Sequence, residues 1–140
     1  MGKDSSRQYD WKGRKVLIVE DDPAGSLLLA EILALTGIEV RQVGDGKEAV
    51  DICRQDPEID IVLLDMQVPG ISGYDAAVEI RKIRQELPII AQSAFVYGEE
   101  KQRALKAGCD AHISKPLNKV ELLGTMNRLL RISGDRSMQA

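Results

Sequence analysis

Lys15-Val-Leu-Ile-Val-Glu-Asp-Asp22 is a short apolar run, rich in β-branched residues, that ends in acidic side chains. A run of this length and composition predicts a strand that is buried on both faces of a sheet. Pro23 follows at once and suits the first turn of a helix, with Asp22 at the N-cap position. The stretch therefore predicts a buried strand, an acidic loop and a helix in succession.

The same succession of strand and helix recurs along the chain. Further strands are expected over 40–43, 59–64, 88–93 and 111–114, and helices from Pro23 to the break at Gly37 and over 47–54, 73–84, 99–107 and 117–132. Five strands that alternate with five helices predict an α/β sandwich of three layers, with helices on both faces of a parallel sheet. We expect one domain over 13–132, between a flexible N-terminal segment at 1–12 and a flexible tail at 133–140.

Composition and charge exclude several classes of protein. The chain has 140 residues, of which 44% are hydrophobic and 29% charged, as in ordinary globular proteins. A net charge of -3 gives no basic face for nucleic acid. No apolar run approaches the ~20 residues that cross a bilayer, and the polar start lacks a secretory apolar stretch. We therefore expect a cytoplasmic protein that contacts neither nucleic acid nor membrane directly.

Cysteine and histidine usage argues against a structural zinc site. Cys53 and Cys109 are far apart and form no CxxC pair, and His112 is the only histidine. Zinc sites in proteins need several such ligands in a cluster. The two cysteines are expected to be reduced thiols.

Polar side chains follow the predicted strands at their carboxyl ends, where open parallel sheets place their sites. They are Glu20-Asp21-Asp22, Asp65, Ser93 and Lys115. Clustered carboxylates resist joint ionisation unless a cation lies among them, and oxygen ligands favour a hard cation such as Mg²⁺. The Asp65 carboxylate could attack phosphorus, with Lys115 and Ser93 binding the phosphoryl oxygens. The residues therefore predict metal-assisted phosphoryl transfer to Asp65.

Several short segments at these positions match one known family. They are Val16-Leu-Ile-Val-Glu-Asp-Asp22, Leu63-Leu-Asp-Met-Gln-Val-Pro69, Gly73, Ala91-Gln-Ser-Ala94, Ala107-Gly108 and Ile113-Ser-Lys-Pro116. In this set the chain resembles the receiver (response-regulator) domain of two-component signalling, and it looks most like receivers attached to hybrid sensor histidine kinases. The resemblance implies a flavodoxin-like fold, with a five-stranded parallel sheet in the order 2-1-3-4-5.

The resemblance also implies a phosphoacceptor with a metal ion beside it. Asp65 would accept a phosphoryl group from the phosphohistidine of a histidine kinase or a histidine phosphotransfer domain. Mg²⁺, with Mn²⁺ as a possible substitute, would be held by Asp21, by Asp65 and by the main-chain carbonyl of Gln67. Glu20 would act on the metal through water. A downstream partner would recognise the surface that changes when Asp65 is phosphorylated.

Two further matching residues would complete the switch. Ser93 takes the place of the hydroxyl residue that responds to phosphorylation, and Lys115 takes the place of the phosphoryl-binding lysine. The family also implies a cis peptide bond between Lys115 and Pro116, which is rare outside X-Pro bonds. Asp22 is expected to cap the following helix and not to bind metal.

Three positions depart from the commonest pattern of the family or tune it. His112 stands where many relatives carry a rotating aromatic residue, and it is smaller, polar and titrates near neutrality; the alternative is a surface histidine without a switching role. Phe95 is bulky and, with Gln67, is expected to restrict the hydrolytic water and so to prolong the life of the phosphoryl group. Ala94 is small and should leave the entry to Asp65 open.

Other functions stay open from the sequence. A receiver-like interaction module would never be phosphorylated. An aspartyl-nucleophile phosphohydrolase usually needs a second aspartate two residues after the nucleophile, where this chain has Gln67. A flavin-binding electron-transfer protein needs a first loop that cradles phosphate, which Glu20-Asp21-Asp22 would repel. The isolated chain is not expected to be an enzyme beyond catalysing its own phosphorylation and dephosphorylation, although it could belong to a hybrid histidine kinase.

Overall fold

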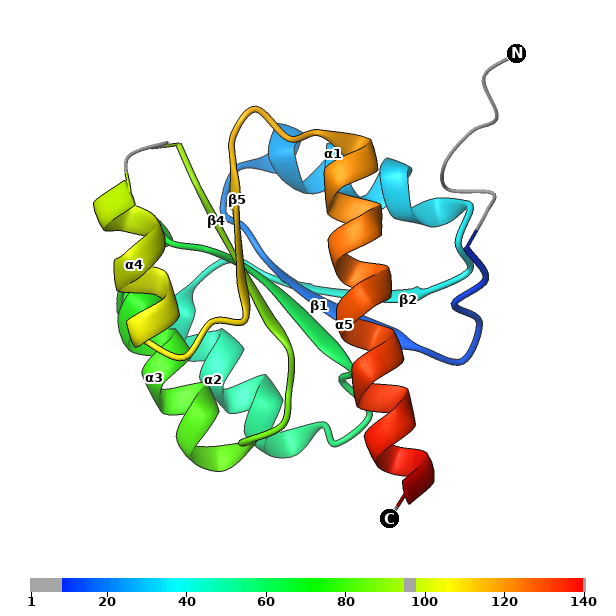
Figure 1. The fold of residues 1–140 in the computed structure, drawn as a ribbon. Coiled ribbons are helices and arrows are strands. Elements are labelled where there is room, and N and C mark those ends of the chain that lie inside the picture. The colour runs from blue at the N-terminus through cyan, green and yellow to red at the C-terminus, as the bar shows by residue number, and fades with distance from the viewer. Residues whose placement is uncertain (1–8, 95–97, 140) are drawn as a thin grey trace.

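A computed structural model of the chain describes residues 9–94 and 98–139. Strands and helices alternate in this part of the chain, as the sequence pattern predicts (Figure 1). The strands are β1 (Lys15–Val19), β2 (Glu39–Val43), β3 (Ile61–Asp65), β4 (Ile89–Ser93) and β5 (Ala111–Ser114). The helices are α1 (Pro23–Ala34), α2 (Gly46–Gln55), α3 (Gly73–Ile83), α4 (Gly98–Lys106) and α5 (Lys119–Gln139).

The strands form one sheet in the order β2-β1-β3-β4-β5, and all neighbours are parallel. Helices α1 and α5 cover one face of the sheet, and α2, α3 and α4 cover the other (Figure 1). This three-layer architecture confirms the flavodoxin-like order expected from the sequence. Because all strands run the same way, their carboxyl ends lie at a single edge of the sheet.

Each face of the sheet has its own hydrophobic core. Along β1, Val16 and Ile18 belong to the core beneath α1 and α5, whereas Leu17 and Val19 belong to the core beneath α2, α3 and α4. The alternation follows because successive strand residues point to opposite faces of the sheet. An apolar strand without polar interruptions is therefore buried on both sides.

The described structure departs from the expected segment boundaries at both ends. Trp11 is 6% exposed, and its backbone N–H donates to the backbone carbonyl of Thr36 at 2.7 Å. The N-terminal segment at 1–12 thus contains a residue of the core. Helix α5 continues to Gln139, past the expected end at Ile132, so the expected tail is helical up to that residue. No helix in the described part of the chain is long and apolar enough to span a membrane.

Strand β3 begins later and ends later than the sequence pattern indicates. Asp60 lies before the strand, where its N–H donates to Lys15 O at 2.8 Å and its carboxylate accepts from Lys15 N at 2.8 Å. At the other end, Asp65 is paired with Gln92 in the β3–β4 ladder. Asp65 is therefore held within the sheet, not in the loop that follows.

Candidate functional site

Three carboxylates come together at the carboxyl edge of the sheet. Glu20 and Asp21 directly follow β1, and Asp65 is the last residue of its neighbour β3. One carboxylate oxygen from each residue lies within 4.8 Å of the other two. Glu20 and Asp65 are buried, with 3% and 4% exposure, whereas Asp21 is exposed. The acidic pair and the candidate acceptor that the sequence predicts therefore lie in one cluster.

Both oxygens of Asp65 have a hydrogen-bond donor. The Gln67 N–H donates to Asp65 Oδ1 at 2.9 Å, and Lys115 Nζ donates to Asp65 Oδ2 at 2.7 Å. The backbone of Asp65 is fixed by the ladder with β4. The carboxylate thus has a defined orientation before any ligand arrives.

The Lys115 ammonium bridges two acidic side chains. Besides Asp65, Lys115 Nζ lies 3.3 Å from Glu20 Oε1. Partial burial lowers the pKa of Lys115, but the hydrogen bond to Asp65 and the charges of Asp65 and Glu20 outweigh it, so the net pKa is raised. Lys115 therefore carries its positive charge at neutral pH, beside the candidate acceptor.

The donor set of the cluster suits a hard divalent cation. Its three members offer carboxylate oxygens, without sulfur or imidazole, and such oxygens bind Mg²⁺ and also Mn²⁺. Burial and the neighbouring Asp65 raise the pKa of Glu20, although the Asp22 N–H and Lys115 act against this. The cluster therefore resists full ionisation, and a cation among its oxygens would relieve the repulsion.

The loops beside the cluster contain several other residues named from the sequence. Asp22 caps α1, because its carboxylate accepts from the Gly25 N–H at 3.1 Å. The Lys115–Pro116 peptide bond is cis, which confirms that expectation. Ala94 is exposed directly after β4. Phe95 lies outside the described residues, so its expected role in restricting water stays a prediction.

The candidate switch serine is bonded to the only histidine of the chain. Ser93 is 1% exposed at the end of β4, and its Oγ lies 2.7 Å from Nε2 of His112 on β5. The sequence placed His112 at the switch position but did not reveal this bond. Burial, and then the charge of Lys101, lower the pKa of His112, whereas Glu100 and Glu121 act in the opposite direction. The neutral ring, which can accept from the serine hydroxyl, is therefore favoured.

The titration of His112 gives a first prediction. Its pKa is expected below the ordinary value of 6.5. Because the folded state then binds the proton less readily than the unfolded state, stability should fall as the pH drops below about 6.5. Proton NMR of the His112 ring measures the midpoint directly, since the chain has a single histidine.

The control for this titration is His112→Gln, which has no group that titrates near neutral pH. Its stability should vary less with pH between about 5 and 7 than that of the wild type. A midpoint above the ordinary value would contradict the partly buried, hydrogen-bonded ring.

Two further features of this end of the molecule were missed by sequence reasoning. The Tyr74 hydroxyl donates to the Glu100 carboxylate, and the Arg103 guanidinium lies 3.9 Å from the Tyr74 ring centroid, so α3 is tied to α4. Gln92 is 2% exposed within β4. Its only sequence signal is a polar residue in the apolar run Ile89-Ile-Ala-Gln-Ser93.

Residues 16–127 match the response regulator receiver domain family. The chain belongs to this family. The matched range runs from the second residue of β1 past the end of β5 and includes all residues of the carboxylate cluster. The carboxylate cluster, Lys115 and Ser93 therefore lie within a receiver domain of two-component signalling.

The relatives of this receiver domain include sensor kinases and a single-domain regulator. It is 37% identical over 102 residues to the sensor histidine kinase RcsC of Escherichia coli K12, which covers 73% of this chain and 11% of that kinase. It is 29% identical over 119 residues to the polar-differentiation response regulator DivK of Brucella ovis, which covers 84% of this chain and 96% of that protein. The receiver domain thus spans only a small part of the sensor kinase that it resembles.

A solved structure shares the fold of this receiver domain. It is the receiver domain of the sensor histidine kinase PA1611 from Pseudomonas aeruginosa PAO1, with a magnesium ion coordinated in its active site cleft. The TM-score is 0.78 and the sequence identity is 31%, with 84% of this chain and 98% of that chain covered. The similarity therefore extends over almost the whole described domain.

Proposed function

We propose that this receiver domain is a phosphorylation switch in which Asp65 accepts a phosphoryl group from a phosphohistidine. The observation that carries the proposal is the position of the Asp65 carboxylate, in one cluster with Glu20 and Asp21 and bonded to the Lys115 ammonium. Phosphoryl transfer needs little from a protein beyond a fixed acceptor and nearby positive charge. Asp65 has a fixed backbone in the sheet ladder and a cation at hydrogen-bond distance.

The proposed transfer forms one bond and breaks another. An oxygen of Asp65 attacks phosphorus, the P–N bond of the phosphohistidine breaks, and its electron pair stays on the imidazole nitrogen of the donor. The product is an acyl phosphate on Asp65. Asp21, Asp65 and the Gln67 carbonyl would hold Mg²⁺, or Mn²⁺ in its place, and Glu20 would act through water. The metal would neutralise charge on the phosphoryl oxygens.

Ser93 is the group that we expect to respond. Its hydroxyl is bonded to His112 Nε2. A phosphoryl group on Asp65 adds charged acceptor oxygens, and hydrogen bonds to charged groups are stronger than neutral ones. We expect Ser93 to exchange His112 for a phosphoryl oxygen, which would alter the surface around α4, β5 and α5. A partner that binds the two surfaces with different affinity completes the switch.

The proposed upstream partner is a histidine kinase or a histidine phosphotransfer domain. The similarity to RcsC supports this proposal, because the printed name of that relative is a sensor histidine kinase. The similarity to DivK, which the match covers almost completely, supports a stand-alone receiver as the alternative. We also propose that the domain acts in the cytoplasm, as expected from the sequence.

Acetyl phosphate tests the proposed function without a protein donor. Incubation of the purified chain with acetyl phosphate and Mg²⁺ should add the mass of one phosphoryl group, as measured by intact mass spectrometry. Chelation of the metal by EDTA should prevent the gain. A folded chain that gains no mass would instead favour a phosphorylation-independent interaction module. Steady turnover of a phosphate ester such as p-nitrophenyl phosphate would favour a phosphohydrolase.

A further inference from the structure

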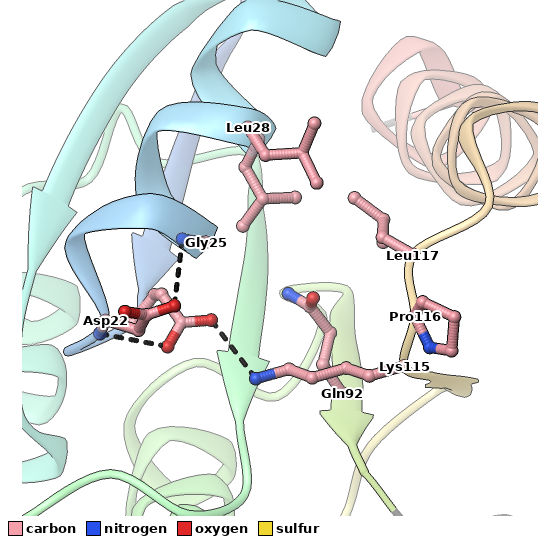
Figure 2. Close-up of a pocket in the computed structure, with 9 residues that line it drawn as sticks. Asp22, Gly25, Leu28, Gln92, Lys115, Pro116 and Leu117 are labelled. Carbon is pink, nitrogen blue, oxygen red and sulfur yellow. Dashed lines mark hydrogen bonds and ion pairs between the residues drawn. The ribbon is translucent and has the colours of Figure 1, made fainter.

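A pocket of about 200 Å³ lies between α1 and the segment that follows β5 (Figure 2). Most of its wall is apolar and is formed by Leu28, Leu29, Pro116 and Leu117. Glu20, Lys115 and Asp22 contribute the polar part of the wall. The pocket therefore adjoins the carboxylate cluster, although most of its surface has a different chemistry.

Gln92 contributes an unpaired hydrogen-bond donor to this pocket. Its side chain is 2% exposed, and its Nε2 has no hydrogen-bond partner in the part of the chain that the structure describes. Figure 2 shows the amide of Gln92 directed into the space between Leu28 and Leu117. Buried polar groups normally have a partner, since an unpaired one keeps the full cost of losing water. The amide is therefore directed at a position where an acceptor would be bound.

The charged groups of the lining are already engaged. Lys115 Nζ is bonded to Asp65 and Glu20. The Asp22 carboxylate accepts from the Gly25 N–H. A charged ligand would compete with these interactions, whereas a neutral ligand would leave them in place. The pocket thus favours a neutral molecule with an apolar body and a single acceptor for Gln92.

We propose that this pocket binds a small neutral ligand, in which an apolar body contacts the Leu28–Leu117 wall and a carbonyl oxygen accepts a hydrogen bond from Gln92 Nε2. The volume of the pocket corresponds to roughly seven water molecules, which suits a ligand of one small ring. Lys115 lines the pocket and also binds Asp65, so the pocket shares a residue with the carboxylate site. The binding itself does not depend on phosphorylation and is tested separately from it.

N-methyl-2-pyrrolidone is a suitable probe, because it is a neutral ring with one carbonyl oxygen and no N–H group. Titration into the isotope-labelled chain should move the Gln92 side-chain amide signals saturably, together with the backbone amides of Leu28 and Leu117. The expected dissociation constant is roughly millimolar for a ligand of this size.

Two variants distinguish recognition by the Gln92 amide from unselective binding in an apolar cavity. Gln92→Leu keeps a similar side-chain volume but removes the donor. It should lower the affinity for the lactam by about tenfold, as expected for one lost hydrogen bond. Leu28→Trp should fill the pocket from its rim and abolish binding; Leu28 is 46% exposed, so the larger side chain does not disturb the core.

Two results would overturn the proposal. They are the absence of saturable shifts in the wild type and equal lactam affinity in Gln92→Leu. The second would show an apolar cavity in which the amide does not select the ligand.

Discussion

Replacing Asp65 with asparagine is expected to abolish phosphorylation by acetyl phosphate and to remove most of the stabilisation that Mg²⁺ gives to the wild-type chain. An asparagine amide cannot form an acyl phosphate, so the acceptor is lost. The substitution also replaces a charged ligand by a neutral oxygen in a cluster of three carboxylates, which weakens the attraction for a hard cation. Both losses follow from a single change that keeps the volume of the side chain.

Intact mass spectrometry and thermal unfolding with and without Mg²⁺ measure these two effects. At a metal concentration of about 100 times the dissociation constant, binding should stabilise the wild type by about 2.7 kcal/mol, and Asp65→Asn should lose most of this. Asp51→Asn is the matched control, because Asp51 lies on α2, where it pairs with Arg54 at 3.6 Å. Asp51→Asn should still be phosphorylated by acetyl phosphate and still be stabilised by Mg²⁺. Phosphorylation of Asp65→Asn at the wild-type rate would show that the acceptor is another residue.

Replacing Gly73 with alanine is expected to destabilise the fold and to disturb the carboxylate site. A Cβ atom at Gly73 would lie 2.5 Å from Met66 Cα and 2.6 Å from Asp65 O, and both contacts are with backbone. Alanine is a better helix former than glycine by up to about 1 kcal/mol, but overpacking of this kind costs about 1–3 kcal/mol. The clash should therefore outweigh the propensity, and relief of the clash must move the backbone next to Asp65.

Urea unfolding of Gly73→Ala measures the loss of stability, and the rate of phosphorylation by acetyl phosphate measures the disturbance at Asp65. Gly124→Ala is the control, because Gly124 is a helical residue of α5 whose added Cβ would have nothing within 4 Å. This control should gain about 0.5–1 kcal/mol from helix propensity alone. A Gly73→Ala chain as stable as the wild type would mean that the close packing of α3 against β3 has no energetic consequence.

The order of elements and the location of the site could be predicted from the sequence, because both depend on local patterns. Apolar runs such as Lys15 to Val19 identify buried strands without knowledge of their neighbours. Parallel strands then place the residues after them at one edge, which is how Asp65 and Lys115 come within hydrogen-bond distance. The chemistry of the site follows from residue types at strand ends.

The packing of Trp11 and the end of α5 could not be predicted from local patterns. Trp11 follows a polar stretch and gives no periodic signal, yet it is buried and bonded to Thr36. Helix α5 passes Ile132 through polar residues that break the apolar stripe on which its expected end was based. Local hydrophobicity indicates the core of an element more reliably than its end.

Side-chain partners across strands also could not be predicted. The bond between Ser93 and His112 needs the register of β4 against β5, in which Ser93 is paired with Ser114. Gln92 Nε2, which has no hydrogen-bond partner among the described residues, faces a space between α1 and the segment after β5. Such features arise from the tertiary arrangement, and sequence reasoning can only mark the residues as unusual.

A crystal structure of the chain with Mg²⁺ and beryllofluoride, a stable mimic of the phosphoryl group, is the most direct test of the proposed switch. We predict one metal ion bound by Asp21, Asp65 and the Gln67 carbonyl, with beryllium on an Asp65 oxygen. Ser93 Oγ should then bond a fluorine and no longer His112. A metal ion bound away from Asp65, or a Ser93 that keeps its bond to His112 beside bound beryllofluoride, would contradict the account.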